Sequence, residues 1–287
     1  MKKLETEKKK RLLISLIVIF GTIIVIAVSV ILIKLIVNNM SARDSKQLQE
    51  SYAENLHQES YAPGLPKGTG EGGSASLPGE ESGSSDPGSE KPVKNEVKFD
   101  ELIERNSDAY SWIYIPNTNI SLPVMQSAED DNFYLEHDID KNYKFAGCIY
   151  SQSKNKKDYS DRVTVLYGHN MADGSMFANL HYYMDDEFFD THRYIYIYTP
   201  DRRLTYEVVS AYEYDNRHIL NSFDFTDDAV FSDWLEGAKN PHSVYSKVRD
   251  DVKLDLKSKM LVLSTCMPSG DNRFIVQGVL IKDEKTE

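Results

Sequence analysis

The sequence has little cysteine: two residues, Cys148 and Cys266, in a chain of 287. A small domain stapled by disulfides would carry more, and a chain of this length can bury a hydrophobic core without them. One disulfide between the two remains open. Cys148 follows Gly147 in an apolar stretch and is typical of a small buried residue. Cys266 is therefore the candidate thiol for chemistry.

Several motifs of common chemistries are also missing. The sequence contains no Cys-x-x-Cys, no His-Glu-x-x-His and no Gly-x-Ser-x-Gly. Its glycine-rich stretch, residues 68–73, does not lie between a strand and a helix, so no phosphate cradle is indicated. Acidic runs at residues 129–131 and 224–228 could hold Ca²⁺ weakly. They lack the EF-hand spacing and are more typical of solvated loops or helix N-termini, so we expect no metal and no cofactor.

Positive charge is scarce beyond the first residues. The chain has 33 Lys and Arg against 45 Asp and Glu, a net charge of −12, and residues 1–11 hold six of the basic side chains. An acidic body argues against nucleic acid as a partner. It is compatible with a protein of the outer cell surface.

Residues 12–33 form one long run without a charge. A helix of that length spans ~33 Å, about the hydrocarbon core of a bilayer. The basic residues before it place the N-terminus in the cytoplasm and the remainder outside. The rival interpretation, a cleaved signal peptide, fits less well because the run is long and no small-x-small site follows closely. We expect a cytoplasmic segment at 1–11, a transmembrane anchor at 12–37 and a stalk at 38–61.

Gly, Ser, Pro and Glu dominate residues 62–95, which predicts a flexible linker because such a segment buries too little apolar surface to become ordered. A folded domain is expected at 96–287. A short N-terminal helix is expected from Phe99, and further helical patterns cover residues 174–183 and 227–238, the last with Thr226 as N-cap. Short strands are expected at residues 112–115, 120–124, 147–150, 163–167, 194–199, 204–214, 260–265 and 274–281. Eight short strands in a mainly β domain suggest a small barrel, which removes exposed edges.

Cys266 ends an apolar run, residues 260–263, that is typical of a buried strand. A thiol at a strand end lies at a rim, where it can meet a substrate. The ordinary pKa of a thiol is ~8.5, so a nucleophilic cysteine needs a base or a positive charge beside it. Taken alone, a cysteine at a strand end is more often a buried structural residue.

Two side chains and one pair of hydroxyls are candidates for that help. His169 also follows a strand-like run, and an imidazole can take the thiol proton or deliver one to a leaving amine. The turn-forming residues 267–272 predict a hairpin that places Arg273 opposite Cys266. A guanidinium there can favour the thiolate or bind an oxyanion. Ser264 and Thr265 can shape the cleft beside the sulfur. Spacing alone does not show that these groups converge.

The residues around the cysteine match a known family. Sortases carry a Thr-Leu-x-Thr-Cys strand, and this sequence has Val262-Leu263-Ser264-Thr265-Cys266, with Val for the first Thr. The chain resembles sortases, and class B most, over residues 99–282. The class B likeness is carried by residues 108–124, 131–135, 169–177 and 198–201, and by the 227–238 helix inserted before the cysteine strand.

The resemblance implies an eight-stranded sortase barrel and a cysteine transpeptidase. Cys266 would attack the carbonyl of a Thr in the C-terminal sorting signal of a secreted protein and form a thioacyl intermediate. His169 would protonate the leaving amine, and Arg273 would hold substrate carbonyls and the oxyanion. An amine of a cell-wall peptide precursor would then accept the acyl group. By similarity, the groove for the signal peptide would be lined by Ser264, Thr265, Leu135, Asn132 and Tyr167.

Three other functions stay open at this point. A pilin-polymerising sortase would use a Lys side chain as acceptor, and the catalytic residues do not distinguish it. A papain-type hydrolase would carry its Cys at a helix N-terminus with the His after it, whereas His169 precedes Cys266. A non-catalytic surface-binding domain on a stalk would not need the thiol. In each case the domain is expected outside the membrane, as on a Gram-positive cell.

Overall fold

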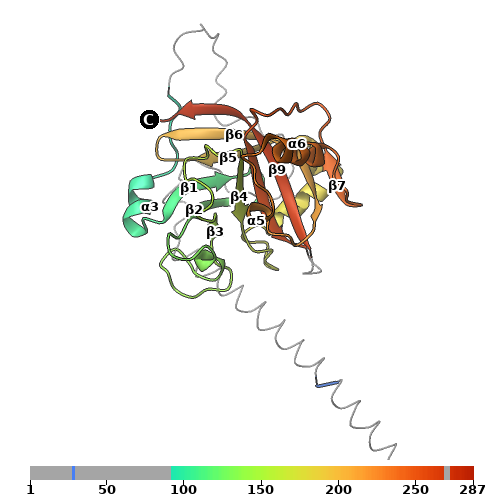
Figure 1. Cartoon of the computed structure of the whole chain (residues 1–287). Coiled ribbons are helices and arrows are strands. Elements are labelled where there is room, and N and C mark those ends of the chain that lie inside the picture. The colour runs from blue at the N-terminus through green and yellow to red at the C-terminus, as the bar shows by residue number, and fades with distance from the viewer. Residues whose placement is uncertain (1–27, 30–91, 268–271) are drawn as a thin grey trace, which may run out of the picture. The chain divides into compact units, whose positions relative to one another are not determined.

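The computed structural model describes residues 28–29, 92–267 and 272–287 (Figure 1). All but the first two belong to one compact unit, Ser51–Glu287. Among the described residues no helix is both long and apolar enough to cross a bilayer. The predicted cytoplasmic segment, anchor, stalk and linker lie outside the described residues, except for residues 28–29 and 92–95.

Eight strands close into a barrel, as the sequence predicted. Neighbouring strands follow the order β5-β1-β2-β3-β4-β8-β9-β6, and pairing of β5 with β6 closes the ring. A further strand, β7, joins the same edge of β6 beyond β5. The strands are β1 Ala109–Tyr114, β2 Ser121–Met125, β3 Ile149–Tyr150, β4 Val163–Tyr167, β5 Tyr194–Tyr198, β6 Arg202–Tyr214, β7 Ser246–Val248, β8 Met260–Cys266 and β9 Arg273–Lys285.

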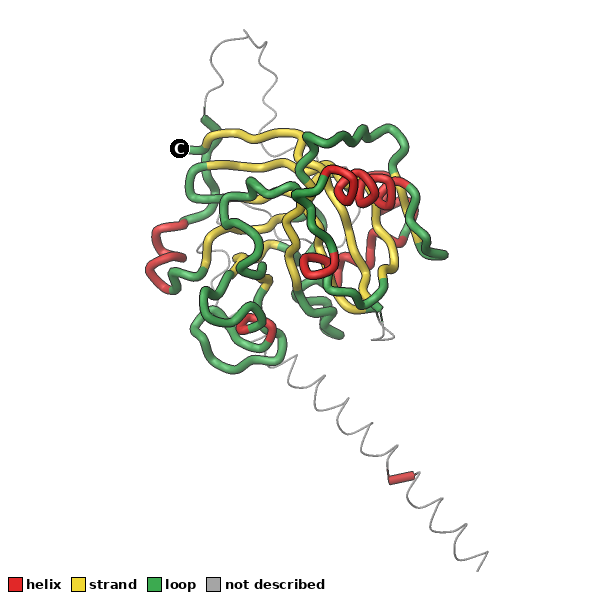
Figure 2. Tube along the Cα trace, in the orientation of Figure 1, coloured by secondary structure: helices red, strands yellow, loops and turns green. Residues whose placement is uncertain are grey.

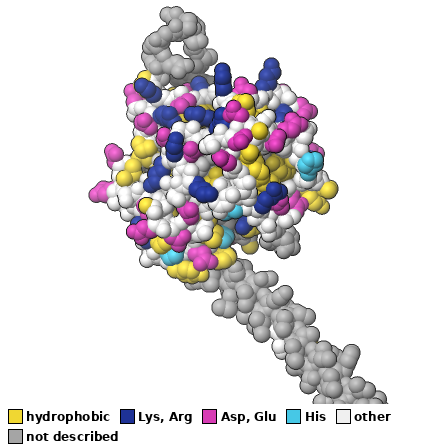
Figure 3. All heavy atoms as spheres, in the orientation of Figure 1, with side chains coloured by type: hydrophobic (Ala, Val, Ile, Leu, Met, Phe, Trp, Pro, Cys, Tyr) yellow, Lys and Arg dark blue, Asp and Glu magenta, His cyan; other side chains and the backbone are white. Residues whose placement is uncertain are grey.

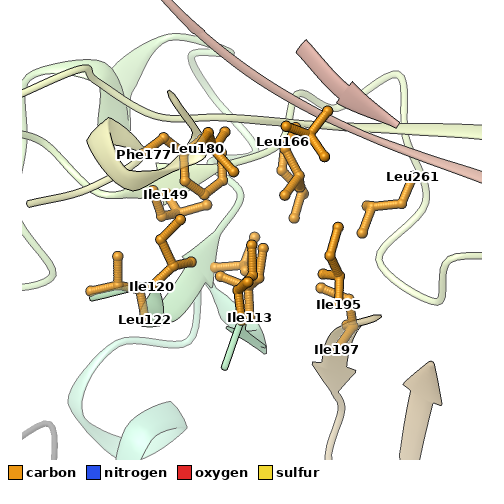
Figure 4. Close-up of a cluster of buried hydrophobic side chains, with 14 of the residues drawn as sticks. Ile113, Ile120, Leu122, Ile149, Leu166, Phe177, Leu180, Ile195, Ile197 and Leu261 are labelled. Atoms are coloured by element: carbon orange, nitrogen blue, oxygen red, sulfur yellow. The ribbon is translucent and has the colours of Figure 1, made fainter. Parts of the chain in front are cut away.

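The sequence of β5, Tyr-Ile-Tyr-Ile-Tyr, shows why these segments form strands. Successive side chains of a strand point to opposite faces. Ile195 and Ile197 therefore face the barrel interior, where they meet Ile113 and Leu166 (Figure 4). The tyrosines of β5 pack on the outer face with the apolar side of α3, Phe99–Arg105. Both faces are buried, so the alternation separates two cores.

Helices and 3₁₀ turns lie outside the barrel, between the strands (Figures 1 and 2). The helix before β1 and the one before the cysteine strand are confirmed. The pattern at 174–183 is a 3₁₀ helix that begins only at Ala178. Two short helices, Asp186–Thr191 and Ile219–Ser222, and the strand β7 were not predicted. The remaining elements are η1 Phe133–Leu135, η2 Ala178–Met184, α4 Asp186–Thr191, α5 Ile219–Ser222 and α6 Asp228–Lys239.

The N-cap of α6 is Asp227 and not Thr226, which corrects the prediction. The carboxylate of Asp227 accepts hydrogen bonds from the backbone amides of Ala229 and Val230, at 2.7 and 3.3 Å. Thr226 is unavailable as a cap because its hydroxyl donates to Asp224 at 2.6 Å. This acidic run therefore serves a helix N-terminus and its preceding turn.

The surface in Figure 3 carries Lys and Arg side chains interspersed with Asp and Glu. On this face the described residues form no broad field of one sign. The Phe231, Trp234 and Leu235 side of α6 is packed against the outer face of the barrel. Because α6 covers this part of the outer face, the ends of the strands are where polar side chains can meet a ligand.

Candidate active site

Cys266 is the last residue of β8 and lies on its outer face. Leu261 and Leu263 point into the barrel, whereas Met260 and Val262 face the core beneath α6. By this alternation Cys266 belongs with the outward-facing residues, and it is half-buried. The apolar run thus packs into a core on each face of β8, and this packing places the Cys266 thiol at the rim of the barrel.

Arg273, the first residue of β9, lies directly opposite Cys266 in the hairpin register, as predicted. Its Nη1 is 2.7 Å from the Cys266 Sγ. The base of the hairpin is fixed by the Met267 amide, which donates to the Asn272 carbonyl at 2.9 Å. The side chain of Asn272 in turn donates to Glu213 of β6 at 2.6 Å. A permanent positive charge therefore faces the sulfur from a braced strand end.

His169 reaches the same rim through the parallel pairing of β4 with β8. Tyr167 pairs with Ser264, and the amide of Gly168 donates to the Ser264 carbonyl at 3.2 Å. His169 follows two residues after Tyr167, just beyond the end of β4, and the charge of Arg273 acts on its imidazole. The carbonyl of His169 is held by the amide of Phe177 at 2.9 Å.

The imidazole of His169 has one nitrogen already bound. Its Nε2 is 2.9 Å from the carbonyl oxygen of Leu135, and because a carbonyl only accepts, Nε2 carries the hydrogen. The ring stacks on Phe145, with centroids 5.0 Å apart. The other ring nitrogen of His169, Nδ1, is therefore the one that can exchange a proton with a substrate or with the thiol.

Burial lowers the pKa of His169 below its ordinary value of 6.5, and the positive charge of Arg273 acts in the same direction. The hydrogen bond to Leu135 and the charge of Glu136 oppose the shift. The imidazole is accordingly neutral at pH 7, with the lone pair of Nδ1 able to accept a proton.

Gly168 is required by close approach. A Cβ at this position would lie 2.5 Å from Cδ1 of Ile149 and 2.9 Å from the ring of Phe177, both in the barrel core. Any larger residue would push these groups apart. The glycine thus lets the chain leave β4 tightly enough to bring His169 to the rim.

Tyr167 and Ser264 lie side by side on the outer face, between the cysteine and the core beneath α6. The ring of Tyr167 stacks on that of Tyr150, with centroids 5.5 Å apart. Burial raises the pKa of Tyr150 to about 12, with Arg273 opposing, so the phenol is neutral. Tyr150 and Ser264 are buried here, and Tyr167 is half-buried between them and the solvent-facing rim.

Thr265 faces the opposite way from Ser264. Its side chain is 1% exposed and shares the interior face of β8 with Leu263, and its Oγ1 has no hydrogen-bond partner among the described residues. The strand alternation that places Cys266 and Ser264 on the outer face turns Thr265 inward. A role for Thr265 in lining a groove stays a prediction, and its hydroxyl faces away from the surface that carries Cys266.

Leu135 and Asn132 lie in and before η1, on the far side of His169 from β8. Leu135 acts through its carbonyl, which holds the imidazole. Asn132 is exposed, and its Oδ1 accepts from Gln152 at 3.1 Å. Its backbone amide donates to Asp130 at 2.9 Å, while Asp131 accepts from a loop amide. These carboxylates brace loops, as expected for the acidic run at 129–131.

Three residues at the site were missed by the sequence analysis. Asn170 and His181 both contact the carbonyl oxygen of Cys266, each at 3.1 Å. Phe145 covers His169. Asn170 could have been found from its place beside His169, whereas nothing in the sequence links His181 or Phe145 to the site.

The two cysteines are not joined. Cys148 is a buried thiol and Cys266 a half-buried one, so the open possibility of a disulfide is settled against it. The site therefore combines an accessible thiol, a fixed cation at hydrogen-bond distance and a neutral imidazole at the same rim. This set can perform nucleophilic attack on a carbonyl with proton transfer to and from an amine.

Comparison with known proteins gives one matching family. The model of the sortase domain matches residues 113–281. Sortase B of Listeria monocytogenes is 32% identical over 192 residues, which cover 66% of this chain and 75% of that protein.

Solved structures agree. Sortase B of Clostridium perfringens has a TM-score of 0.59 at 28% identity, and 64% of this chain covers 100% of that one. A Staphylococcus aureus sortase B–substrate complex has a TM-score of 0.57 at 27% identity, and the match covers 64% of this chain and 84% of that one. A Streptococcus pyogenes class B sortase involved in pilus biogenesis has a TM-score of 0.56 at 26% identity, and the match covers 64% of this chain and 98% of that one.

Proposed function

Since this chain belongs to the sortase family, in its class B, and is thus a cysteine transpeptidase, we propose that it cleaves a C-terminal sorting signal after Thr and transfers the protein to a cell-wall peptide amine. The contact that carries this proposal is Arg273 Nη1 at 2.7 Å from Cys266 Sγ. The position of His169 at the same rim supports it.

In the first step the Cys266 sulfur attacks the carbonyl carbon of the signal's Thr. The tetrahedral intermediate collapses as the C–N bond breaks, which leaves a thioacyl enzyme. The thiol proton ends on the leaving amine, carried through Nδ1 of His169 because Nε2 is held by Leu135.

Arg273 serves the developing negative charge. Its guanidinium has five donors in a planar fork, so one can face the sulfur while others reach the substrate oxygen. A fixed donor of this kind stabilises an oxyanion most where water is excluded. The register of β9 places this cation opposite the cysteine.

In the second step an amine attacks the thioacyl carbon. His169 Nδ1 takes the amine proton, the C–S bond breaks, and the sulfur leaves as the thiol or its conjugate base. We propose an amine of a cell-wall peptide precursor as this acceptor. Water in its place would give hydrolysis.

Four positions are proposed to contact the signal peptide. Tyr167 and Ser264 would form the floor of the groove beside the thiol, and the Asn132 and Leu135 segment would form its wall. The Staphylococcus aureus sortase B–substrate complex, a structural neighbour of this chain, supports a peptide substrate.

The placement outside the membrane also remains a proposal. A single anchor at residues 12–37, with residues 1–11 in the cytoplasm, would hold the catalytic domain at 96–287 on the outer surface of a Gram-positive cell. The linker at 62–95 would give it reach toward secreted proteins and the wall.

A second candidate is pilus assembly, with a Lys side chain as the acceptor. It is favoured by the Streptococcus pyogenes neighbour, which is involved in pilus biogenesis. The chemistry at Cys266 is the same in both cases, and only the acceptor differs.

A peptide-library cleavage assay tests the proposal and separates these candidates. Residues 92–287 would be incubated with Thr-containing peptides alone, with short peptide amines and with Lys-bearing peptides. Cleavage after Thr with transfer to a peptide amine is expected. Transfer only to Lys side chains would favour pilus assembly. Absence of cleavage across the library would refute the proposed reaction and favour a binding domain.

A further inference from the structure

The carbonyl oxygen of Cys266 is held by two side chains from outside its own hairpin. Nδ2 of Asn170 and Nε2 of His181 each lie 3.1 Å from this oxygen. The two donors come from different segments, one just after β4 and the other within η2. They converge on the residue that carries the thiol.

The strand register explains why this carbonyl needs side-chain partners. Hydrogen bonds in a parallel ladder are evenly spaced, so after Gly168 to Ser264 the next donor to β8 would be the amide of residue 170. Instead β4 ends at Tyr167, and Asn170 pairs with Met176. Its side-chain amide takes the place of the missing backbone donor.

His181 completes the contact with a defined tautomer. A carbonyl accepts only, so Nε2 of His181 carries the hydrogen. The ring stacks on Phe274, with centroids 4.7 Å apart, and Phe274 follows Arg273 in β9. Nδ1 is buried and has no hydrogen-bond partner among the described residues. Burial lowers the pKa of His181, which keeps the ring neutral.

One peptide group thus connects the candidate catalytic residues. Asn170 ties it to the segment that carries His169, and His181 ties it to the neighbour of Arg273. Fixing the plane of the peptide after Cys266 fixes the direction in which its side chain leaves the strand end. Displacements of about 1 Å at a reacting group can cost ~10²-fold in rate.

We propose that Asn170 and His181 are positioning residues that clamp the Cys266 carbonyl and so keep its thiol facing Arg273. The inference rests on the proposed role of Cys266 as the nucleophile. Neither residue touches the sulfur in the contacts described, so both act through the backbone of Cys266.

Alkylation of Cys266 by iodoacetamide tests the clamp without any sorting peptide. Alkylation requires the Cys266 sulfur to be presented to the reagent at the rim, and the clamp fixes the direction in which this side chain leaves the strand end. Loosening the clamp should therefore slow alkylation. The rate would be measured at neutral pH on the full chain in detergent, by mass spectrometry of the peptide that contains Cys266, so that Cys148 does not interfere.

His181→Phe keeps the ring stack on Phe274 but removes the donor, and we expect alkylation about tenfold slower, the effect of one lost hydrogen bond of ordinary net strength. His181→Gln restores a donor and should stay within about twofold of the unsubstituted chain. His192→Phe is the matched control. His192 also stacks on a phenylalanine and is bonded through Nε2, but to Asn117.

Asn170→Ala completes the test, because two donors to one oxygen should not act independently. Its effect and that of His181→Phe are expected to be non-additive in the double variant. Alkylation of His181→Phe at the unsubstituted rate would overturn the clamp. Equally slow alkylation of His181→Gln and His181→Phe would also overturn it, because this result would show that the shape of the His181 ring matters and not its hydrogen bond. If alkylation responds to the substitutions as expected but the unsubstituted chain cleaves no peptide, the proposed function is refuted and the clamp is still supported.

Discussion

The hairpin register places Arg273 opposite Cys266, and its Nη1 lies at hydrogen-bond distance from the Cys266 sulfur. Substitution of Arg273 should therefore affect the reaction strongly. Arg273→Ala should lower kcat/KM for a cleaved peptide by at least ~10²-fold, because a fixed oxyanion donor is lost. Arg273→Lys should recover only part of this, since an ammonium lacks the planar fork.

Arg202→Ala is the control for both variants. Arg202 pairs with Asp283 at the opposite part of β9 and makes no described contact with the site. Its variant should retain full turnover. Equal turnover of Arg273→Ala and the unsubstituted chain would remove the oxyanion role from Arg273.

Single residues show where sequence reasoning succeeded and where it failed. The facing of Cys266 and Arg273 follows from a turn of known length between two strands, and the structure confirms it. The alternation with Leu263 turns Thr265 to the interior, where it is 1% exposed, an orientation that the sequence analysis did not take into account. The contact of His181 with Cys266 spans 85 residues of chain, and no local pattern encodes such a pairing.

The exit from β4 is the element that brings His169 to the rim, and Gly168 makes it possible. Gly168→Ala places a Cβ 2.5 Å from Ile149, within the core. Overpacking of this kind costs about 1–3 kcal/mol of unfolding free energy, and the displaced loop should also lower cleavage. Urea unfolding measures the first effect and peptide turnover the second.

Gly237→Ala is the matched control within α6. A Cβ there meets nothing within 4 Å. The substitution should raise the unfolding free energy by about 0.5–1 kcal/mol, because alanine favours the helix. If both alanine variants behaved alike, close packing at Gly168 would not be the reason for glycine.

The start of α6 gives a second test at this scale. Asp227→Ala should lower the unfolding free energy by about 0.5–2 kcal/mol through loss of the N-cap. Thr226→Ala should change it by less than about 0.5 kcal/mol, since surface substitutions away from caps are nearly neutral. Urea denaturation of both variants measures the difference. A larger loss in Thr226→Ala would restore the threonine as the cap.

The elements themselves were predictable where alternation is strong. All eight barrel strands were found, most of them because they have several alternating or wholly apolar residues, as in β5. The two-residue strand β3 was found as part of a longer predicted segment, residues 147–150. The strand β7 was missed because its three residues, Ser246–Val248, are only half-buried and pair on one edge of β6. The four-residue helix α5 is too short for a periodic signal.

For the molecule as a whole, three half-buried histidines contribute to the response to mild acid. Burial lowers the pKa of His169, His181 and His192 below the ordinary 6.5. The unfolded chain therefore binds more protons than the folded chain as the pH falls below that value. The stability they contribute is present above pH 6.5 and is lost as the pH falls through the lowered folded values.

The Tm should therefore be nearly constant above about pH 7 and fall between about pH 6.5 and 5, the range in which unperturbed histidine takes up its proton. His192→Phe should show a shallower fall, because one of the three titrations is gone. Calorimetry at several pH values measures both. A Tm that rises on acidification would contradict the assigned directions.

For the molecule as a whole, we expect a barrel whose rim carries one nucleophilic thiol, Cys266. The most direct test is cleavage of a Thr-containing peptide by the Cys266→Ala variant, with Cys148→Ala as the control thiol. Loss of all cleavage is predicted for Cys266→Ala, with circular dichroism unchanged, and retained cleavage for Cys148→Ala. Continued cleavage by a folded Cys266→Ala variant would contradict the account.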